Sequence, residues 1–167
     1  MTTMMQASKK RVGYRYRVVN LNKKYKINTN FVKKLISEVL KYIKRAQDTE
    51  LEVVFVADKE IKVLNKKYRK EDSPTDVLSF KIDRKEFGSN LFLGEIFISL
   101  DTAFKNCALF GTEFEKEITL YVIHGVLHLF GYDDEDQKNK KKMFKRQEQI
   151  LGCICKNEDL SKVLMPR

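Results

Sequence analysis

The chain has only two histidines, and both lie in one apolar segment that has the boundary signals of a single helix. Thr112 and Glu115 form a T-x-x-E pattern, which is typical of a capping box at a helix N-terminus. Apolar residues then continue to Phe130, and Gly131 suits the left-handed conformation that ends many helices. The sequence therefore predicts a helix that carries both histidines and stops directly after them.

The spacing of the histidines predicts a metal site. His124 and His128 are four residues apart, so their imidazoles project from the same helical face, one turn apart. The break at Gly131 lets the chain fold back and return Asp134 toward the metal. The pattern H-x-x-x-H-x-x-G-x-x-D matches the ligand spacing of metzincin-type zinc sites, with Asp in place of the usual third His. A carboxylate is an acceptable zinc ligand, so we expect about one zinc ion per chain.

Other interpretations of this segment stay open. The histidines could be core residues whose ring nitrogens bond to the backbone, without a metal. A zinc peptidase would carry Glu directly after its first histidine as general base, and position 125 is glycine. A glycine inside a helix costs roughly 1 kcal/mol relative to alanine. Gly125 therefore indicates close approach of a substrate or of packed backbone, for which a helix–sheet contact would suffice.

The rest of the chain alternates between strand-like and helix-like segments. Runs of β-branched and aromatic residues predict strands over residues 14–21, 51–57, 77–82 and 91–100. Apolar residues at helical spacing and capping signals predict helices over residues 29–46, 58–69, 101–109 and 136–151. This order predicts one α+β domain over residues 1–167, with a small mixed four-stranded sheet against which the C-terminal helices pack.

Local signals predict details of three of these helices. Thr29 and Asp58 are the expected N-caps of the first and second helices. Met143, Phe144 and Ile150 are expected on the inner side of the last helix.

The chain carries a net charge of +10, and the excess is concentrated in residues 1–48. That region holds thirteen Lys or Arg and two acids, with tyrosines interspersed. A basic region with aromatic residues can bind a polyphosphate backbone and stack on bases, whereas the alternative is a solvated lysine-rich face. Neither a run of eighteen apolar residues nor a secretory signal is present, so a cytoplasmic protein without a membrane span is expected.

Several segments together resemble one known family. HGVLHLFGYDDED resembles the H-G-x-L-H-L-x-G-Y-D-H signature of the YbeY family of bacterial rRNA maturation endoribonucleases. LNKKYRKEDSPTDVLSF resembles the arginine-containing segment and P-T-D-V-L-S-F strand of that family. LGEIFIS resembles its L-G-D-I-x-I-S strand, and MFKRQEQIL fits its last helix. The likeness spans about residues 50–151 in order.

The resemblance implies a metal-dependent endoribonuclease that acts on 16S rRNA of the small ribosomal subunit, in 3′-end maturation and ribosome quality control. It implies that His124 and His128 are zinc ligands, with Asp134 at the position of a third histidine. Asp133 matches the family's Asp before that ligand, and it could orient a ligand or compete for the metal. Arg69 matches the family's functionally important arginine, so we expect Arg69 and His124 to be catalytic.

An arginine near a metal site suits phosphodiester cleavage, because its planar guanidinium can hold two phosphate oxygens and stabilise the charge of the transition state. Without the motif, Arg69 would be a helix-terminal residue that interacts with the helix dipole. The main rival to the enzyme is a non-catalytic RNA- or ribosome-binding factor with a structural metal, and a zinc peptidase ranks below it. In the enzyme, either water or the 2′-hydroxyl of the RNA could attack the phosphate.

Overall fold

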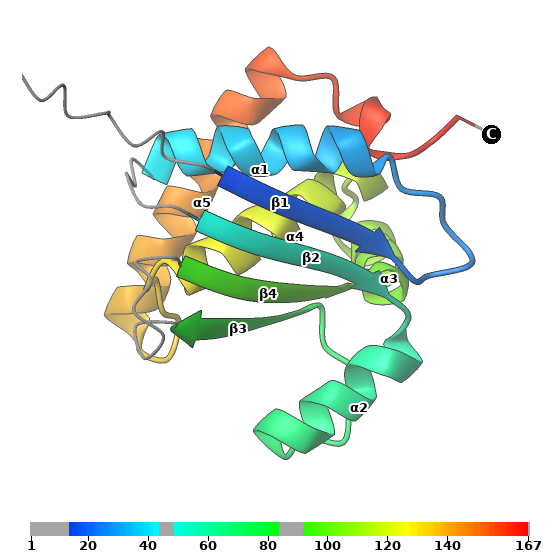
Figure 1. Cartoon of the computed structure of the whole chain (residues 1–167), viewed down its shortest axis with the longest axis vertical. Helices are drawn as coiled ribbons and strands as arrows, with labels where there is room; N and C mark the ends of the chain where they lie inside the picture. Colours follow the sequence, from blue (N-terminus) through cyan, green and yellow to red (C-terminus); the bar gives the residue numbers. More distant parts are fainter. Residues whose placement is uncertain (1–13, 44–48, 84–91, 167) are drawn as a thin grey trace, which may run out of the picture.

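The computed structural model describes residues 14–43, 49–83 and 92–166, which together form four strands and five α-helices (Figure 1). The strands are β1 (Tyr14–Asn20), β2 (Thr49–Val56), β3 (Val77–Asp83) and β4 (Phe92–Ser99). The α-helices are α1 (Thr29–Ile43), α2 (Asp58–Arg69), α3 (Leu100–Phe110), α4 (Phe114–Leu129) and α5 (Gln137–Asn157). A 3₁₀ turn at Leu160–Val163 follows. The predicted α+β class is confirmed, whereas the single-domain organisation stays a prediction.

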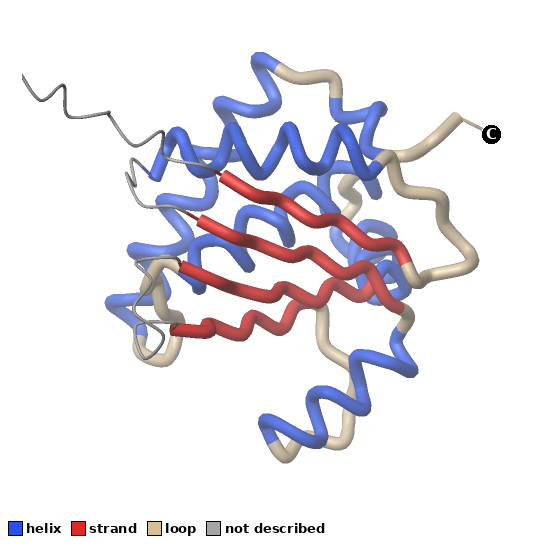
Figure 2. The backbone as a smooth tube through the Cα atoms, in the orientation of Figure 1, coloured by secondary structure: helices blue, strands red, loops and turns tan. Residues whose placement is uncertain are grey.

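The four strands form one mixed sheet in the order β1-β2-β4-β3 (Figures 1 and 2). β1, β2 and β4 run parallel, because a helix-containing connection returns the chain before each new strand. β3 runs antiparallel to β4 and forms one edge of the sheet. The predicted small mixed sheet is therefore confirmed.

The main hydrophobic core lies between the sheet and the helices α1 and α4 (Figure 1). Alternate residues of β2 face this core and are almost completely buried, namely Leu51, Val53 and Phe55. α4 contacts β3, β4, α1, α3 and α5, so it is covered on most sides. Its packing therefore fixes the two histidines relative to the sheet.

α2 extends away from the sheet at the bottom of Figure 1. Ile61 near its start packs with Val54 and Leu78 in a second, smaller hydrophobic cluster. At its far end, the ring of Tyr68 lies 4.8 Å from the ring of Phe80 in β3, measured between centroids. These contacts hold the end of α2 against the sheet and so position the residue that follows Tyr68.

The predicted N-caps of α1 and α2 are wrong. Asn28, and not Thr29, caps α1, because its Oδ1 accepts a hydrogen bond from the Phe31 N–H at 3.1 Å. The N-cap of α2 is Ala57, whose N–H donates to Oε2 of Glu60 at 3.1 Å. Asn28 and Thr29 are both good N-cap residues, so the sequence did not separate them, whereas the carboxylate of Asp58 accepts hydrogen bonds from Ser99 and Thr102 instead of capping α2.

The start of α4 and the inner side of α5 also differ from prediction. The expected capping box is absent at Glu113, the N-cap of α4, and Thr112 instead donates to Oε1 of Glu117 at 2.6 Å. Phe144 of α5 is 61% exposed, so its expected inward orientation is wrong. Gln147 is buried at this face instead, one helical turn after Met143.

Candidate metal centre

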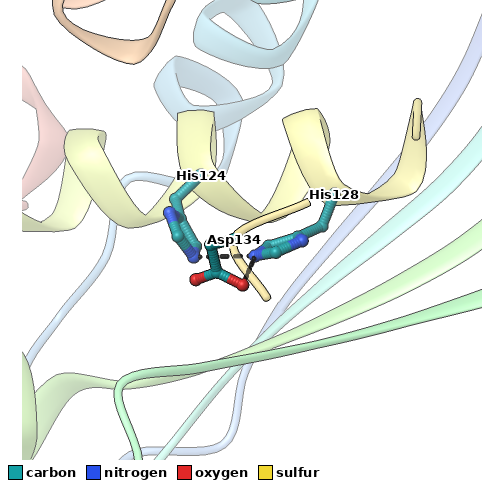
Figure 3. A group of neighbouring side chains, drawn as sticks. All are labelled: His124, His128 and Asp134. Carbon is teal, nitrogen blue, oxygen red and sulfur yellow. Dashed lines mark hydrogen bonds and ion pairs between the residues drawn. The ribbon is translucent and has the colours of Figure 1, made fainter. Parts of the chain in front are cut away.

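His124 and His128 point from one face of α4 toward Asp134, which lies in the turn after that helix (Figure 3). The Nε2 atoms of the two imidazoles are 3.0 Å apart. Nε2 of His128 lies 3.9 Å from Oδ1 of Asp134. One ligand atom from each of the three residues lies within 4.8 Å of the others. The structure thus brings together the three residues that the sequence predicts as metal ligands.

This donor set fits a divalent metal ion. Zinc binds imidazole nitrogen at about 2.0–2.1 Å in tetrahedral sites, which separates neighbouring donor atoms by about 3.3 Å. The observed separations of 3.0 and 3.9 Å lie on either side of that value. Two imidazoles and one carboxylate are a ligand set of zinc hydrolases, and they leave a fourth position for water or substrate.

The ring nitrogens that face away from this centre are both engaged. Nδ1 of His128 lies 3.1 Å from the Tyr132 carbonyl oxygen, and Nδ1 of His124 lies 2.9 Å from Oε1 of Gln147. The Tyr132 carbonyl oxygen is an acceptor, so Nδ1 of His128 donates to it, and Oε1 of Gln147 is placed to accept from Nδ1 of His124. With both Nδ1 atoms donating, the two Nε2 lone pairs face the space that a metal ion would occupy.

The end of α4 brings the third ligand back to the histidines. Gly131 has a φ of +88°, so the predicted left-handed residue is confirmed. The Tyr132 N–H donates to the carbonyl of Leu127 at 3.1 Å, which reverses the chain direction. Asp133 shapes the next turn, since its Oδ1 accepts from the Glu135 N–H at 2.8 Å. The group within 4.8 Å contains Asp134, and Asp133 is not one of its members.

The surroundings of His128 favour its neutral, metal-binding form. Burial lowers the pKa of the His128 imidazole, and electrostatic repulsion between the two neighbouring imidazoles acts in the same direction. The Asp134 carboxylate and the Tyr132 carbonyl raise the pKa but do not outweigh burial. The positive charge of Arg69, at the end of α2, has a smaller effect in the same direction as burial.

Gly125 allows α4 to lie close to the sheet. A β-carbon at this position would lie 2.5 Å from Cγ2 of Ile96 in β4. Oγ of Ser79 in β3 donates to the Gly125 carbonyl at 3.2 Å. Of the interpretations left open for Gly125, the structure supports the helix–sheet contact.

Gln147 is the site residue that sequence reasoning missed. Its side chain comes from α5 and is 8% exposed, and it contacts only the first of the two histidines. Buried residues of α5 recur at positions 143, 147, 150, 151 and 154, which is helical spacing. A glutamine inside that apolar stripe was the available signal.

A cavity of about 250 Å³ opens beside the turn that carries Asp134. It is lined by Phe130, Gly131, Tyr132, Asp133, Asn139 and Lys142. Nζ of Lys142 lies 5.9 Å from the centroid of the Tyr132 ring. The cavity therefore combines an aromatic ring, an amide and a cation next to the candidate metal centre.

In the ranges that the structure covers, no helix is both long and apolar enough to cross a membrane.

Comparison with known proteins gives one family. The model of the Endoribonuclease YbeY family matches residues 17–154. Endoribonuclease YbeY of Halalkalibacterium halodurans is 39% identical over 130 residues, which cover 72% of this chain and 82% of the relative. Endoribonuclease YbeY of Acholeplasma laidlawii is 40% identical over 134 residues, covering 80% and 94%. The solution structure of TM1509 from Thermotoga maritima matches with a TM-score of 0.57 and 32% identity, covering 85% of this chain and 93% of that one.

Proposed function

The chain belongs to the YbeY family of endoribonucleases, and on that premise we propose that His124, His128 and Asp134 hold the metal ion of its reaction. Membership makes the chain a metal-dependent, RNA-cleaving hydrolase of rRNA maturation. The observation that carries the ligand assignment is the 3.0 Å approach of two Nε2 atoms in rings whose Nδ1 atoms both face an oxygen acceptor.

The ion proposed for this centre is zinc. Two imidazoles and one carboxylate suit zinc, although the carboxylate adds negative charge where a third imidazole would add none. When bound, the ion supplies Lewis acidity toward a phosphate oxygen and lowers the pKa of water. The neutral state of His128, favoured by burial, keeps its Nε2 lone pair available for that ion.

Arg69 is proposed to hold the scissile phosphate. Its guanidinium can donate two parallel hydrogen bonds to phosphate oxygens and stabilise the negative charge that develops in the transition state. The support is its exposed position at the end of α2, directly after Tyr68, whose ring packs on Phe80 of β3. His124 and His128 act in this mechanism as metal ligands and not as proton carriers.

The proposed substrate is 16S rRNA near its 3′ end, in the small ribosomal subunit and in the cytoplasm. The net charge of +10 favours a polyphosphate partner. The cavity beside Asp134 offers the Tyr132 ring for stacking on a base and the Lys142 ammonium for a phosphate. The basic residues within segments 1–13 and 44–48 lie outside the described residues, so their part in RNA binding stays a prediction.

The first experiment measures metal content per chain in protein purified without a histidine tag, for the native chain and for Asp134→Ala. We expect about one zinc ion per native chain and loss of zinc in the variant. The same proteins are then incubated with labelled RNA that spans the 3′ end of 16S rRNA, with and without a chelator. Cleavage by the native chain should stop with the chelator and return with zinc.

The rival functions give different results in this assay. Tight, salt-dependent RNA binding without cleavage by zinc-loaded protein would establish a non-catalytic binding factor. Casein hydrolysis that disappears in His124→Ala would establish a peptidase. A 2′,3′-cyclic phosphate at the 3′ end of the upstream fragment would identify the 2′-hydroxyl as the attacking group, whereas a 3′-hydroxyl at that end would identify water.

A further inference from the structure

Gln147 contacts the nitrogen of His124 that faces away from the metal centre. Its Oε1 lies 2.9 Å from Nδ1 of the imidazole, and the side chain is 8% exposed. We infer that Gln147 is a positioning residue, which holds His124 in the tautomer and orientation that present Nε2 to the metal ion. This inference rests on the proposed function, because it assumes that His124 is a ligand.

The burial of Gln147 argues for a specific role. It lies in a stripe of apolar residues on α5, between Met143 and Ile150, where the amide would otherwise be desolvated without compensation. An amide oxygen accepts one hydrogen bond from Nδ1 and thereby leaves the Nε2 lone pair free. The reversed amide would donate to Nδ1 and move the ring proton to Nε2, where it would block metal binding.

The two histidine ligands are held by different means. The Nδ1 atom of His128 donates to the Tyr132 carbonyl, four residues further along the chain. The Nδ1 atom of His124 depends on a side chain from α5, which contacts α4 through tertiary packing. The orientation of His124 is therefore coupled to the docking of α5, whereas that of His128 is not.

The neutral amide also sets the charge of the centre. Ligand histidines commonly donate to a carboxylate, which makes the imidazole a stronger base and tightens metal binding. In this chain the partner of His124 is uncharged, and the centre receives its single negative charge from Asp134. A glutamate at position 147 should accept the same hydrogen bond and bind zinc more tightly than the native glutamine does.

Three variants test the inference. Gln147→Met preserves side-chain length but removes the acceptor, and Gln147→Glu preserves the acceptor. Gln149→Leu is the matched control, because Gln149 is an exposed glutamine on the same helix. The zinc dissociation constant is measured by competition with a chromophoric chelator, and the tautomer of His124 in metal-free protein is read from its ¹⁵N chemical shifts.

Zinc binding should be about 10- to 100-fold weaker in Gln147→Met than in the native chain. Gln149→Leu should bind zinc with the affinity of the native chain. His124 should carry its proton on Nδ1 in the native chain and populate both tautomers in Gln147→Met. Native affinity and an unchanged tautomer in Gln147→Met would overturn the inference, as would an Nε2-protonated His124 in the native chain. If Gln147→Met fails to fold, Gln147→Glu is the deciding variant. A zinc affinity of Gln147→Glu no higher than that of the native chain would overturn the inference.

Failure of the proposed metal centre gives a separate result. A native chain that binds no zinc contradicts the ligand assignment directly. The ¹⁵N measurement on metal-free protein still reports whether Gln147 fixes the tautomer of His124.

Discussion

Ile96 and Gly125 approach so closely that a β-carbon on the glycine would lie 2.5 Å from Cγ2 of the isoleucine. The contact joins β4 to α4 one residue after His124. Ile96 is completely buried in the middle of the sheet, so it has little freedom to move aside. The distance between the sheet and the histidine-bearing face of α4 therefore depends on the absence of a side chain at position 125.

Gly125→Ala should destabilise the protein, although alanine is the better helix former. The added methyl group forces α4 away from β4, which should lower the free energy of unfolding by about 1–3 kcal/mol. Urea denaturation measures this loss. The matched control is Gly152→Ala in α5, where a β-carbon meets nothing within 4 Å. In Gly152→Ala the free energy of unfolding should rise by up to about 1 kcal/mol. Equal changes in the free energy of unfolding at both positions would contradict the packing argument.

Arg69→Ala should lower kcat for RNA cleavage by about 10²- to 10³-fold, because a charge-stabilising donor is lost. The zinc content should not change, since Arg69 is outside the ligand group. The kcat of Arg69→Lys should lie between those of the native chain and of Arg69→Ala, because lysine keeps the charge but cannot donate two parallel hydrogen bonds. Lys67→Ala, an exposed charge in the same turn of α2, should have a small effect. An equal loss of kcat at both positions would point to general electrostatic attraction of RNA.

Asp58 should stabilise the protein at neutral pH but not in acid. Its Oδ1 accepts hydrogen bonds from Ser99 and Thr102, both at 2.6 Å, and Lys105 bonds Oδ2. Burial alone would raise the pKa of Asp58, but these hydrogen bonds outweigh burial and lower it. A carboxyl whose pKa is lower in the folded state stabilises that state above the unfolded value, and the contribution disappears as the pH falls through the folded value.

Asp58→Asn should therefore lower the free energy of unfolding at pH 7, by about 1–3 kcal/mol. The difference from the native chain should shrink as the pH falls below about 4. Urea denaturation of both proteins over a pH series measures the difference. A difference that stays constant down to the acid limit would show that ionisation of Asp58 contributes nothing.

Lys70→Gly should stabilise the end of α2. Lys70 has a φ of 65°, a left-handed conformation that costs a side-chain-bearing residue roughly 1–2 kcal/mol. Glycine removes this strain but has more freedom in the unfolded chain, so the expected net gain is up to about 1 kcal/mol. Lys70→Ala keeps the strain and should give no gain. Thermal unfolding compares the two variants, and an equal change in both would exclude backbone strain as the cause.

The ligand turn could be predicted from sequence because its determinants are local. His124, His128, Gly131 and Asp134 lie within eleven consecutive residues, and helix geometry directly relates the two histidines. The order of strands and helices was predictable for a similar reason, since each element has its own hydrophobic period.

Features that depend on tertiary packing were missed. The inner side of α5 depends on how that helix docks on α4, so Phe144 is exposed against expectation, and the burial of Gln147 was not predicted. Asp58 was expected to cap α2, but its carboxylate is used by residues of α3 and the end of β4. Polar side chains can bond locally or across the fold, and a single sequence does not show which of these bonds forms.

The proposed metal ligands and the proposed phosphate clamp come from separate parts of the chain. His124, His128 and Asp134 all lie in α4 and its following turn, so one short segment supplies the three donor atoms. Arg69 lies at the end of α2, which the Tyr68–Phe80 contact connects to β3. In the proposed mechanism, metal binding and phosphate binding therefore depend on different contacts, so a chain that holds zinc can still lack a correctly placed phosphate clamp.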